Sequence, residues 1–162
     1  MRSSGPIVSL QMAYSLWERD AENGNLAACR EFGMGFMAYS VLGRGYLAGL
    51  FHAPDDLPAD DGRRRSDRFQ GDELDRSRQL LAAIEDIARE KHATPAQVSI
   101  AWVLAQGDGV IPIPGAKSRR HLDDDLGALE IELTAADLAR LDALRPADPA
   151  AGPRELVTSG RA

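Results

Sequence analysis

Two loops of the chain combine glycine with basic residues and could bind an anion. The first spans residues 40–45 and reads SVLGRG, so that its glycines would let backbone amides approach a ligand and Arg44 would add positive charge. Glycine turns after strands are common, and a simple turn explains this loop equally well. Considered by itself, the first loop is therefore weak evidence for a binding site.

The second loop spans residues 114–121 and leads from a glycine turn into a predicted helix. The free amides and the dipole of a helix N-terminus favour an anion. Lys117, Arg119 and Arg120 lie in the same turn, where positive charge opposes the dipole and calls for a negative ligand. We therefore interpret this loop as a phosphate site. The acidic run at 123–125 is either a solvated face or a set of acceptors for the amino group of an adenine ring.

The hydrophobic pattern predicts the elements that position these loops. Strands are expected at 6–11, 34–39 and 110–113. Helices are expected at about 21–32, with Asp20 as its cap and Gly33 after its end, at about 77–92 and 95–106, and after Ser118 and Thr134. Residues 43–75 are interpreted as a long irregular stretch. The domain would span 1–145, followed by a frayed tail over 146–162.

Strands that alternate with helices indicate parallel βα units and an α/β fold. Three strands cannot close a barrel, and parallel strands need both faces covered, so the pattern is an incomplete part of a larger fold. In (β/α)8 barrels, phosphate is often held by the loops after the seventh and eighth strands. The two candidate loops would be these loops if the segment is the end of a barrel.

The composition excludes several classes of function. The net charge of −6 over 162 residues argues against a nucleic acid or an anionic membrane as the main partner. Cys29 is the one cysteine, so we expect no internal disulfide and a reducing compartment. The chain shows neither an apolar run of membrane-spanning length nor the apolar stretch of a signal peptide. We expect a cytoplasmic protein.

Four segments of the chain resemble the aldo-keto reductase superfamily. They are residues 10–16 (LQMAYSL), 35–45 (GFMAYSVLGRG), 99–106 (SIAWVLAQ) and 111–117 (IPIPGAK). The similarity is greatest to the branch whose strand-seven and strand-eight motifs read AYSPLGRG and IPIPGT, and it runs in order from about residue 6 to residue 145. The resemblance implies an NADPH-dependent reductase of aldehydes and ketones on a (β/α)8 TIM barrel. This chain would be its C-terminal portion, with strands 6–8.

The resemblance also implies which residues bind NADP(H). Gln11 would hydrogen-bond the nicotinamide carboxamide, and Tyr39 would stack on the nicotinamide ring. The pyrophosphate would lie along the first loop, and the 2′-phosphate and the adenine would lie against the second loop and its helix. The residues implied for these regions are Ser40, Val41, Leu42, Gly43, Arg44 and Gly45, then Gly115, Lys117, His121, Asp124 and Asp125, with Arg119 and Arg120 as neighbours.

Three positions depart from the pattern of that branch. Val41 replaces a proline, which changes the stiffness of the first loop slightly. Asp125 replaces an asparagine, which removes an amide donor and adds negative charge near a phosphate. Ala13 stands where the branch often has an acidic residue.

The same resemblance implies that the chain carries no catalytic residue. The family's Asp, Tyr, Lys and His tetrad lies on the first four strands, whereas this chain begins at a segment similar to the sixth. Tyr14, Tyr46, His52 and His92 have no Lys or Asp neighbours at the family's spacing, so we assign none of them to catalysis. Cys29 is expected to pack against the sheet, and no residue is assigned to a metal. The arginine run at 63–65 could form a patch for a polyanion, but the resemblance implies the family's arginine-rich stretch after strand seven, either solvated or folded over the cofactor.

Three functions stay open. The first is a reductase segment, inactive by itself, that binds a small carbonyl substrate only when completed by the other half. The second is a non-catalytic NADP(H)-binding module, or a half-barrel that pairs with a partner. The third is a module for another anion, bound by the second loop. Open sheet edges and an uncovered apolar face would also favour self-association.

Overall fold

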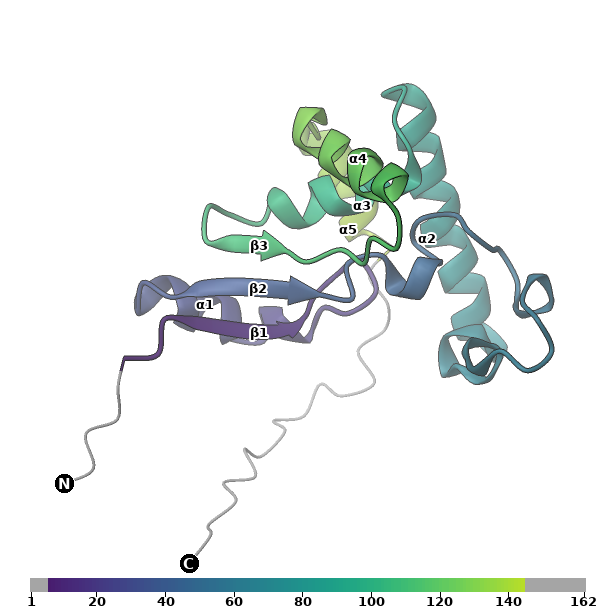
Figure 1. Cartoon of the computed structure of the whole chain (residues 1–162), viewed down its shortest axis with the longest axis horizontal. Helices are drawn as coiled ribbons and strands as arrows, with labels where there is room; N and C mark the ends of the chain where they lie inside the picture. The colour runs from purple at the N-terminus through teal and green to yellow at the C-terminus, as the bar shows by residue number, and fades with distance from the viewer. Residues whose placement is uncertain (1–5, 145–162) are drawn as a thin grey trace, which may run out of the picture.

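The computed structural model describes residues 6–144 and contains a three-stranded parallel sheet in the order β1-β2-β3. The strands are β1 (Ser9–Ala13), β2 (Gly35–Tyr39) and β3 (Val110–Pro112). The three arrows point the same way, toward the side on which α2 stands (Figure 1). The three predicted strands are confirmed, but β1 lies two to three residues later than predicted because its extent is set by pairing with β2, from Ser9 opposite Gly35 to Ala13 opposite Tyr39.

Five α-helices accompany the sheet in the described part of the chain. They are α1 (Asn25–Glu31), α2 (Gly71–Glu90), α3 (Pro95–Leu104), α4 (Arg119–Leu126) and α5 (Ala135–Asp142). The prediction that Asp20 caps the first helix is wrong. Asp20 opens a separate 3-10 turn, and Gly24, with a φ of +102°, stands at the N-terminus of α1. Gly33 follows the end of α1 with a φ of +63°, as predicted.

The predicted irregular stretch is shorter and more ordered than the composition indicates. The helix α2 begins at Gly71 rather than at 77, and four 3-10 turns precede it, at Gly43–Gly45, Pro54–Asp56, Gly62–Arg65 and Asp67–Phe69. An aromatic cluster fixes the turns: Trp17 stacks on Tyr46 with ring centroids 4.7 Å apart, and Phe51 and Phe69 pack edge-on against Tyr46. Local composition does not show this cluster because its rings come from distant segments.

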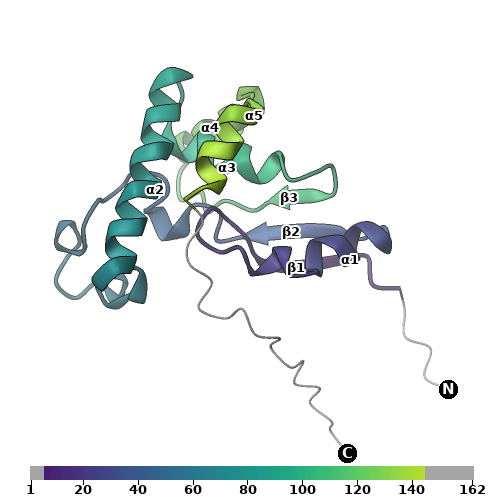
Figure 2. The same cartoon turned by 180° about the vertical axis from the view of Figure 1, so that it is seen from behind.

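The core lies between the sheet and its helices. The helix expected at about 77–92 is confirmed within α2, and its apolar residues form one buried face, made of Leu80, Leu81, Ile84, Ile87 and Ala88. A capping box opens α3, because the Gln97 amide donates to Thr94 Oγ1 at 3.2 Å and the Thr94 amide donates to Gln97 Oε1 at 2.9 Å. Figure 2 shows α1 in front of β1 and β2, and α1 contacts β2. Cys29 of α1 is buried against this core, as predicted.

The two faces of the sheet differ in exposure. Phe36, Ala38 and Val110 share the face covered by the helices and are buried. The alternate residues point to the other face, where Tyr39, Ile111 and Ile113 are 46%, 53% and 37% exposed. No described segment covers this second face, which in a closed barrel is the packed interior.

A second apolar surface lies on α4 and the turn after it. Leu122, Leu126 and Leu129 follow the helical period predicted for this segment and are 49%, 53% and 67% exposed. On α5, by contrast, Leu141 is fully buried, and Leu138 packs partly against the core, as does Leu144 just after the helix. The predicted boundary at 145 and the tail at 146–162 lie outside the described residues.

Candidate functional site

A groove of about 910 Å³ lies where the carboxyl ends of β2 and β3 meet. Both predicted anion loops line it, although some seventy residues separate them in sequence. Parallel strands bring the loops at their carboxyl ends to one edge of the sheet, which is where α/β folds bind ligands. The volume falls within the usual range for small-molecule sites.

The first loop is built from backbone conformations that side chains rarely adopt. Ser40, Gly43, Arg44 and Gly45 have φ values of +62°, +54°, +56° and +98°. Such conformations are allowed for glycine but cost about 1–3 kcal/mol for other residues, and they concentrate at functional sites. The sequence shows the glycines of this loop, but it does not show that Ser40 and Arg44 also adopt a positive φ.

Gly43 serves the packing of the first loop and does not line the groove. A Cβ at this position would lie 2.8 Å from Trp17 Cε3 and 2.9 Å from Leu47 Cγ. The position therefore admits only glycine, and the loop rests directly on the aromatic cluster.

The second loop brings a helix N-terminus and free cations to the groove. Ser118 caps α4, because the His121 amide donates to its Oγ at 3.2 Å. Lys117 and His121 line the groove, whereas Arg119 and Arg120 lie exposed beside it. Within residues 6–144 no carboxylate forms an ion pair with Lys117, Arg119 or Arg120, so their charge is available to a ligand.

Asp124 and Asp125 both line the groove but differ in their contacts. The Asp124 carboxylate accepts hydrogen bonds from Thr94 Oγ1 at 3.3 Å and from Gln97 Nε2 at 3.3 Å, which ties α4 to the start of α3. Asp125 is 8% exposed, and its Oδ2 atom is buried without a partner. Burial, and then the neighbouring Asp124 charge, raise the pKa of the Asp125 carboxyl.

Arg63, from the arginine run noted in the sequence, lines the groove. Its guanidinium pairs with Asp61 at 2.6 Å and donates to the carbonyl of Arg44 at 3.0 Å, so it holds the 3-10 turns against the first loop. The pairing with Arg63 lowers the pKa of Asp61 to about 2. The run of three arginines was the feature of the sequence that pointed to Arg63. Its neighbour Arg64 does not line the groove and pairs with Asp55 at 2.6 Å.

The structure brings most of the implied cofactor residues to this one groove. Gln11 and Tyr39 lie instead on the open face of the sheet, on neighbouring strands whose register places Gln11 opposite Met37 and Tyr39 opposite Ala13. The implied residues that line the groove are Ser40, Val41, Leu42, Arg44, Gly45, Gly115, Lys117, His121, Asp124 and Asp125.

The other reactive side chains have structural surroundings. Tyr14 is fully buried and donates from its hydroxyl to Glu22 at 3.0 Å; burial raises its pKa far above the ordinary value. Tyr46 lies within the aromatic cluster, where burial raises its pKa to about 12. His52 contacts Glu85 at 2.8 Å on the surface. Within residues 6–144 no cluster of His, Cys, Asp or Glu could hold a metal ion.

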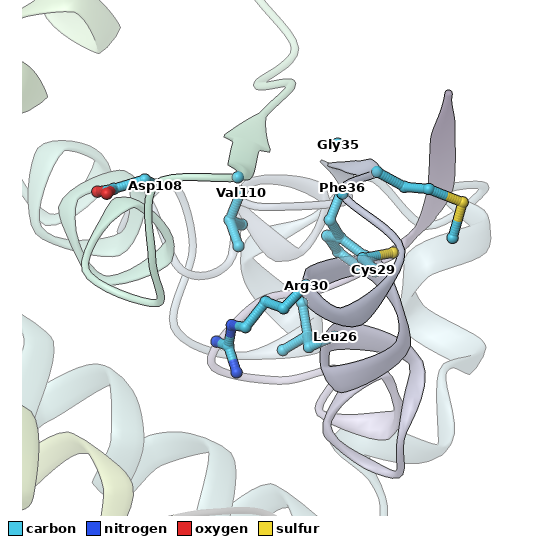
Figure 3. Close-up of a pocket in the computed structure, with 10 residues that line it drawn as sticks. Leu26, Cys29, Arg30, Gly35, Phe36, Asp108 and Val110 are labelled. Carbon is cyan, nitrogen blue, oxygen red and sulfur yellow. The ribbon is translucent and has the colours of Figure 1, made fainter. Parts of the chain in front are cut away.

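A second cavity of about 520 Å³ lies at the amino ends of β2 and β3, opposite the groove (Figure 3). Arg30 of α1 reaches toward the loop before β3 and donates to the carbonyl of Gln106 at 2.7 Å. The Asp108 carboxylate points away from the Arg30 guanidinium (Figure 3). In βα barrels this end of the sheet serves stability, and the contact of Arg30 fits that role.

Parallel βα units with a ligand groove at the carboxyl ends of the strands are the arrangement of (β/α)8 barrel enzymes. The model of the aldo/keto reductase family matches residues 2–146, and the chain therefore belongs to the aldo/keto reductase family. None of the helices within residues 6–144 has the length and apolarity needed to cross a membrane.

Relatives and solved structures agree with this assignment. The chain is 39% identical over 149 residues to probable aldo-keto reductase 1 of Glycine max, and 38% identical over 139 residues to an aldo-keto reductase of Schizosaccharomyces pombe, yakc, whose name carries the label NADP(+). These matches cover 92% and 84% of this chain but 43% and 41% of the relatives. The chain thus spans less than half the length of these relatives.

Two solved structures have a similar fold. The thermostable aldo-keto reductase Tm1743, solved with the inhibitor epalrestat, is 30% identical with a TM-score of 0.63, over 88% of this chain and 42% of that one. The glycerol dehydrogenase AKR11B4 from Gluconobacter oxydans is 24% identical with a TM-score of 0.79, over 92% of this chain and 47% of that one. The second likeness shows the fold only.

Proposed function

We propose that this chain is the NADP(H)-binding part of an aldo-keto reductase, corresponding to strands 6–8 of its (β/α)8 barrel. Aldehyde or ketone reduction would then require the remaining part of the barrel to supply the catalytic residues and most of the substrate site. The observation that carries the proposal is the groove, in which Lys117, His121 and the amide end of α4 meet the first loop. A cytoplasmic location belongs to the same proposal, because Cys29 is a free thiol.

The residues fit a phosphorylated nicotinamide cofactor. Unpaired cations at a helix N-terminus suit a phosphate, and the strained first loop faces the same groove, where a pyrophosphate would lie. When bound, the cofactor would supply the hydride. This chain's own residues would bind its phosphates and its adenine, and Tyr39 and Gln11 on the open face would hold the nicotinamide.

Titration of the 162-residue chain with NADPH, followed by nicotinamide fluorescence, tests the proposal. We expect binding weaker than micromolar, because no described residue covers the open face, and we expect no NADPH-dependent aldehyde reduction. Lys117→Ala should weaken NADPH binding by about tenfold or more, while Arg120→Ala, a cation of the same turn outside the groove, should have a smaller effect. Equal losses in the two variants, or turnover by the purified chain, would contradict the proposal.

A non-catalytic nucleotide- or anion-binding module is the second candidate. It is favoured by one observation: the groove does not include Gln11 or Tyr39, so phosphate binding does not depend on the nicotinamide positions. Equal affinities for NADPH and for 2′,5′-ADP would support the module. Tighter binding of NADPH, lost in Tyr39→Ala, would support the reductase part.

A further inference from the structure

The side chain of Asp125 is unusual among the charged groups of the groove. Only 8% of the Asp125 surface is exposed, and its carboxylate has no hydrogen-bond partner within residues 6–144. Its neighbour Asp124 has its carboxylate satisfied by Thr94 and Gln97. A buried carboxylate without donors is costly, because neither water nor the protein stabilises its charge. A hydrogen bond from a ligand, or a proton, would therefore stabilise Asp125 more than the other charged residues of the groove.

The charges around Asp125 are mixed, and they come from several elements. On α4 itself, Asp124 opposes ionisation of Asp125 and His121 favours it. The helix α3, which packs against α4, carries no titratable side chain, and the turn after α4 carries Glu130, which is exposed. The other charged residues that line the groove are Lys117, Arg44, Arg63 and Asp61.

A phosphate-bearing ligand changes this balance. It brings negative charge to a groove in which Asp124 and Asp125 already lie side by side, and it occupies the cations that would otherwise offset them. Like charges in one site favour protonation of the weaker acid. Burial and Asp124 already raise the pKa of Asp125, so this carboxyl takes the proton rather than the hydrogen-bonded Asp124.

We propose that Asp125 takes up a proton from solvent when a phosphate-bearing ligand fills the groove, and that the neutral carboxyl then donates a hydrogen bond to that ligand. No covalent bond to the ligand forms. The inference rests on the proposed function only in so far as the groove binds anions. It makes Asp125 a proton-linked binding residue.

The sign of the effect follows from linkage. The relevant pH range lies between the pKa of Asp125 in the free groove and its higher pKa in the occupied groove. At a pH within this range, the bound state holds up to one more proton than the free state. Affinity therefore falls as pH rises through that window, by up to about tenfold per pH unit. The window begins above the ordinary aspartate pKa of about 3.9, because the pKa of Asp125 is raised in the free chain.

Calorimetric titration of the chain with inorganic pyrophosphate, and separately with NADPH, tests the inference between about pH 5 and about pH 8. Two buffers of different ionisation enthalpy report the protons taken up. Both titrations are run in a His121→Gln background, which removes the imidazole that lines the groove as a proton acceptor. Asp125→Asn keeps the shape of the side chain and cannot be ionised. Asp123→Asn is the matched control, since Asp123 is exposed on the same helix and does not line the groove.

We expect the Asp123→Asn control to take up more protons on binding than Asp125→Asn, by up to one proton, and to lose affinity more steeply as pH rises. Protons exchanged by the ligand itself are common to both variants and cancel in this difference. The same pH dependence in both variants would overturn the inference, as would an absence of pyrophosphate binding at millimolar concentration by the chain that retains His121. Proton-linked binding of pyrophosphate without any binding of NADPH would uphold the inference and reject the NADP(H) proposal. If Asp125→Asn does not fold, the carboxyl titration of Asp125 followed by ¹³C NMR, with and without pyrophosphate, decides: an unchanged pKa rejects the inference.

Discussion

Single residues set the shape of the anion-binding groove through packing as well as through charge. Gly43 has a φ of +54° and no room for a Cβ between Trp17 and Leu47. We predict that Gly43→Ala destabilises the chain by about 2–3 kcal/mol, through backbone strain and overpacking together. Urea unfolding followed by Trp fluorescence measures the loss.

Gly24→Ala is the control for Gly43→Ala. Gly24 also has a positive φ, of +102°, but nothing lies within 4 Å of a Cβ placed there. Its substitution should cost only the backbone strain, about 1 kcal/mol. If the two variants lose the same stability, the close contacts at Gly43 do not matter.

At the scale of elements, a partly buried ion pair joins α5 to Lys91, the residue that follows α2. Lys91 Nζ lies 2.9 Å from Asp137 Oδ2, and the same carboxylate accepts from the amide and the hydroxyl of Thr134, both at 2.8 Å. Burial alone would raise the pKa of Asp137, but these contacts outweigh it, and the pKa is lowered. A lowered carboxyl pKa stabilises the fold above the ordinary aspartate value, and that contribution is lost as pH falls through the pKa of the folded state.

We therefore predict that Asp137→Asn lowers stability by about 1–2 kcal/mol at neutral pH. The difference from the unmodified chain should shrink as pH falls below about 4. Thermal unfolding followed by circular dichroism across this range provides the measurement. Asp60→Asn, at an exposed carboxylate for which the structure gives no ion pair, should change little at any pH. A loss that is constant with pH would refute the electrostatic explanation.

Elements and caps were largely predictable because their signals are local. The capping boxes at Thr94 and Thr134 and the apolar face of α2 depend on residues three or four positions apart. The groove was predictable only in part, since parallel strands dictate that the two loops meet but not what else lines the groove. Arg63 joins it through turns that are fixed by the aromatic cluster, and those contacts span the sequence distance from Trp17 to Phe69.

At the scale of the whole molecule, the main feature is the face of the sheet that no described segment covers. Tyr39, Ile111 and Ile113 are exposed on it, β1 and β3 have no further strand beside them within residues 6–144, and the leucines of α4 add a second apolar surface. Open edges beside apolar surface promote association. We predict that the chain self-associates with increasing concentration, as measured by sedimentation velocity.

Ile111→Lys should weaken this association, because it places a charge on the open face, at the edge strand β3. Leu50→Lys is the control, since Leu50 is 69% exposed but belongs to none of the three strands and not to the open face. A chain that stays monomeric at all concentrations, or that responds equally to both changes, would show that the open face is not the contact.

The burial of the tyrosines has a practical consequence for labelling. Tyr14 and Tyr46 are fully buried with raised pKa values, whereas Tyr39 is 46% exposed at the carboxyl end of β2. These three are all the tyrosines of the chain. A reagent that attacks phenolate rings, such as tetranitromethane, meets a single accessible phenol, placed directly before the first loop. The native sequence thus contains its own attachment point for a reporter group on the open face of the sheet, next to the first loop, without an introduced cysteine.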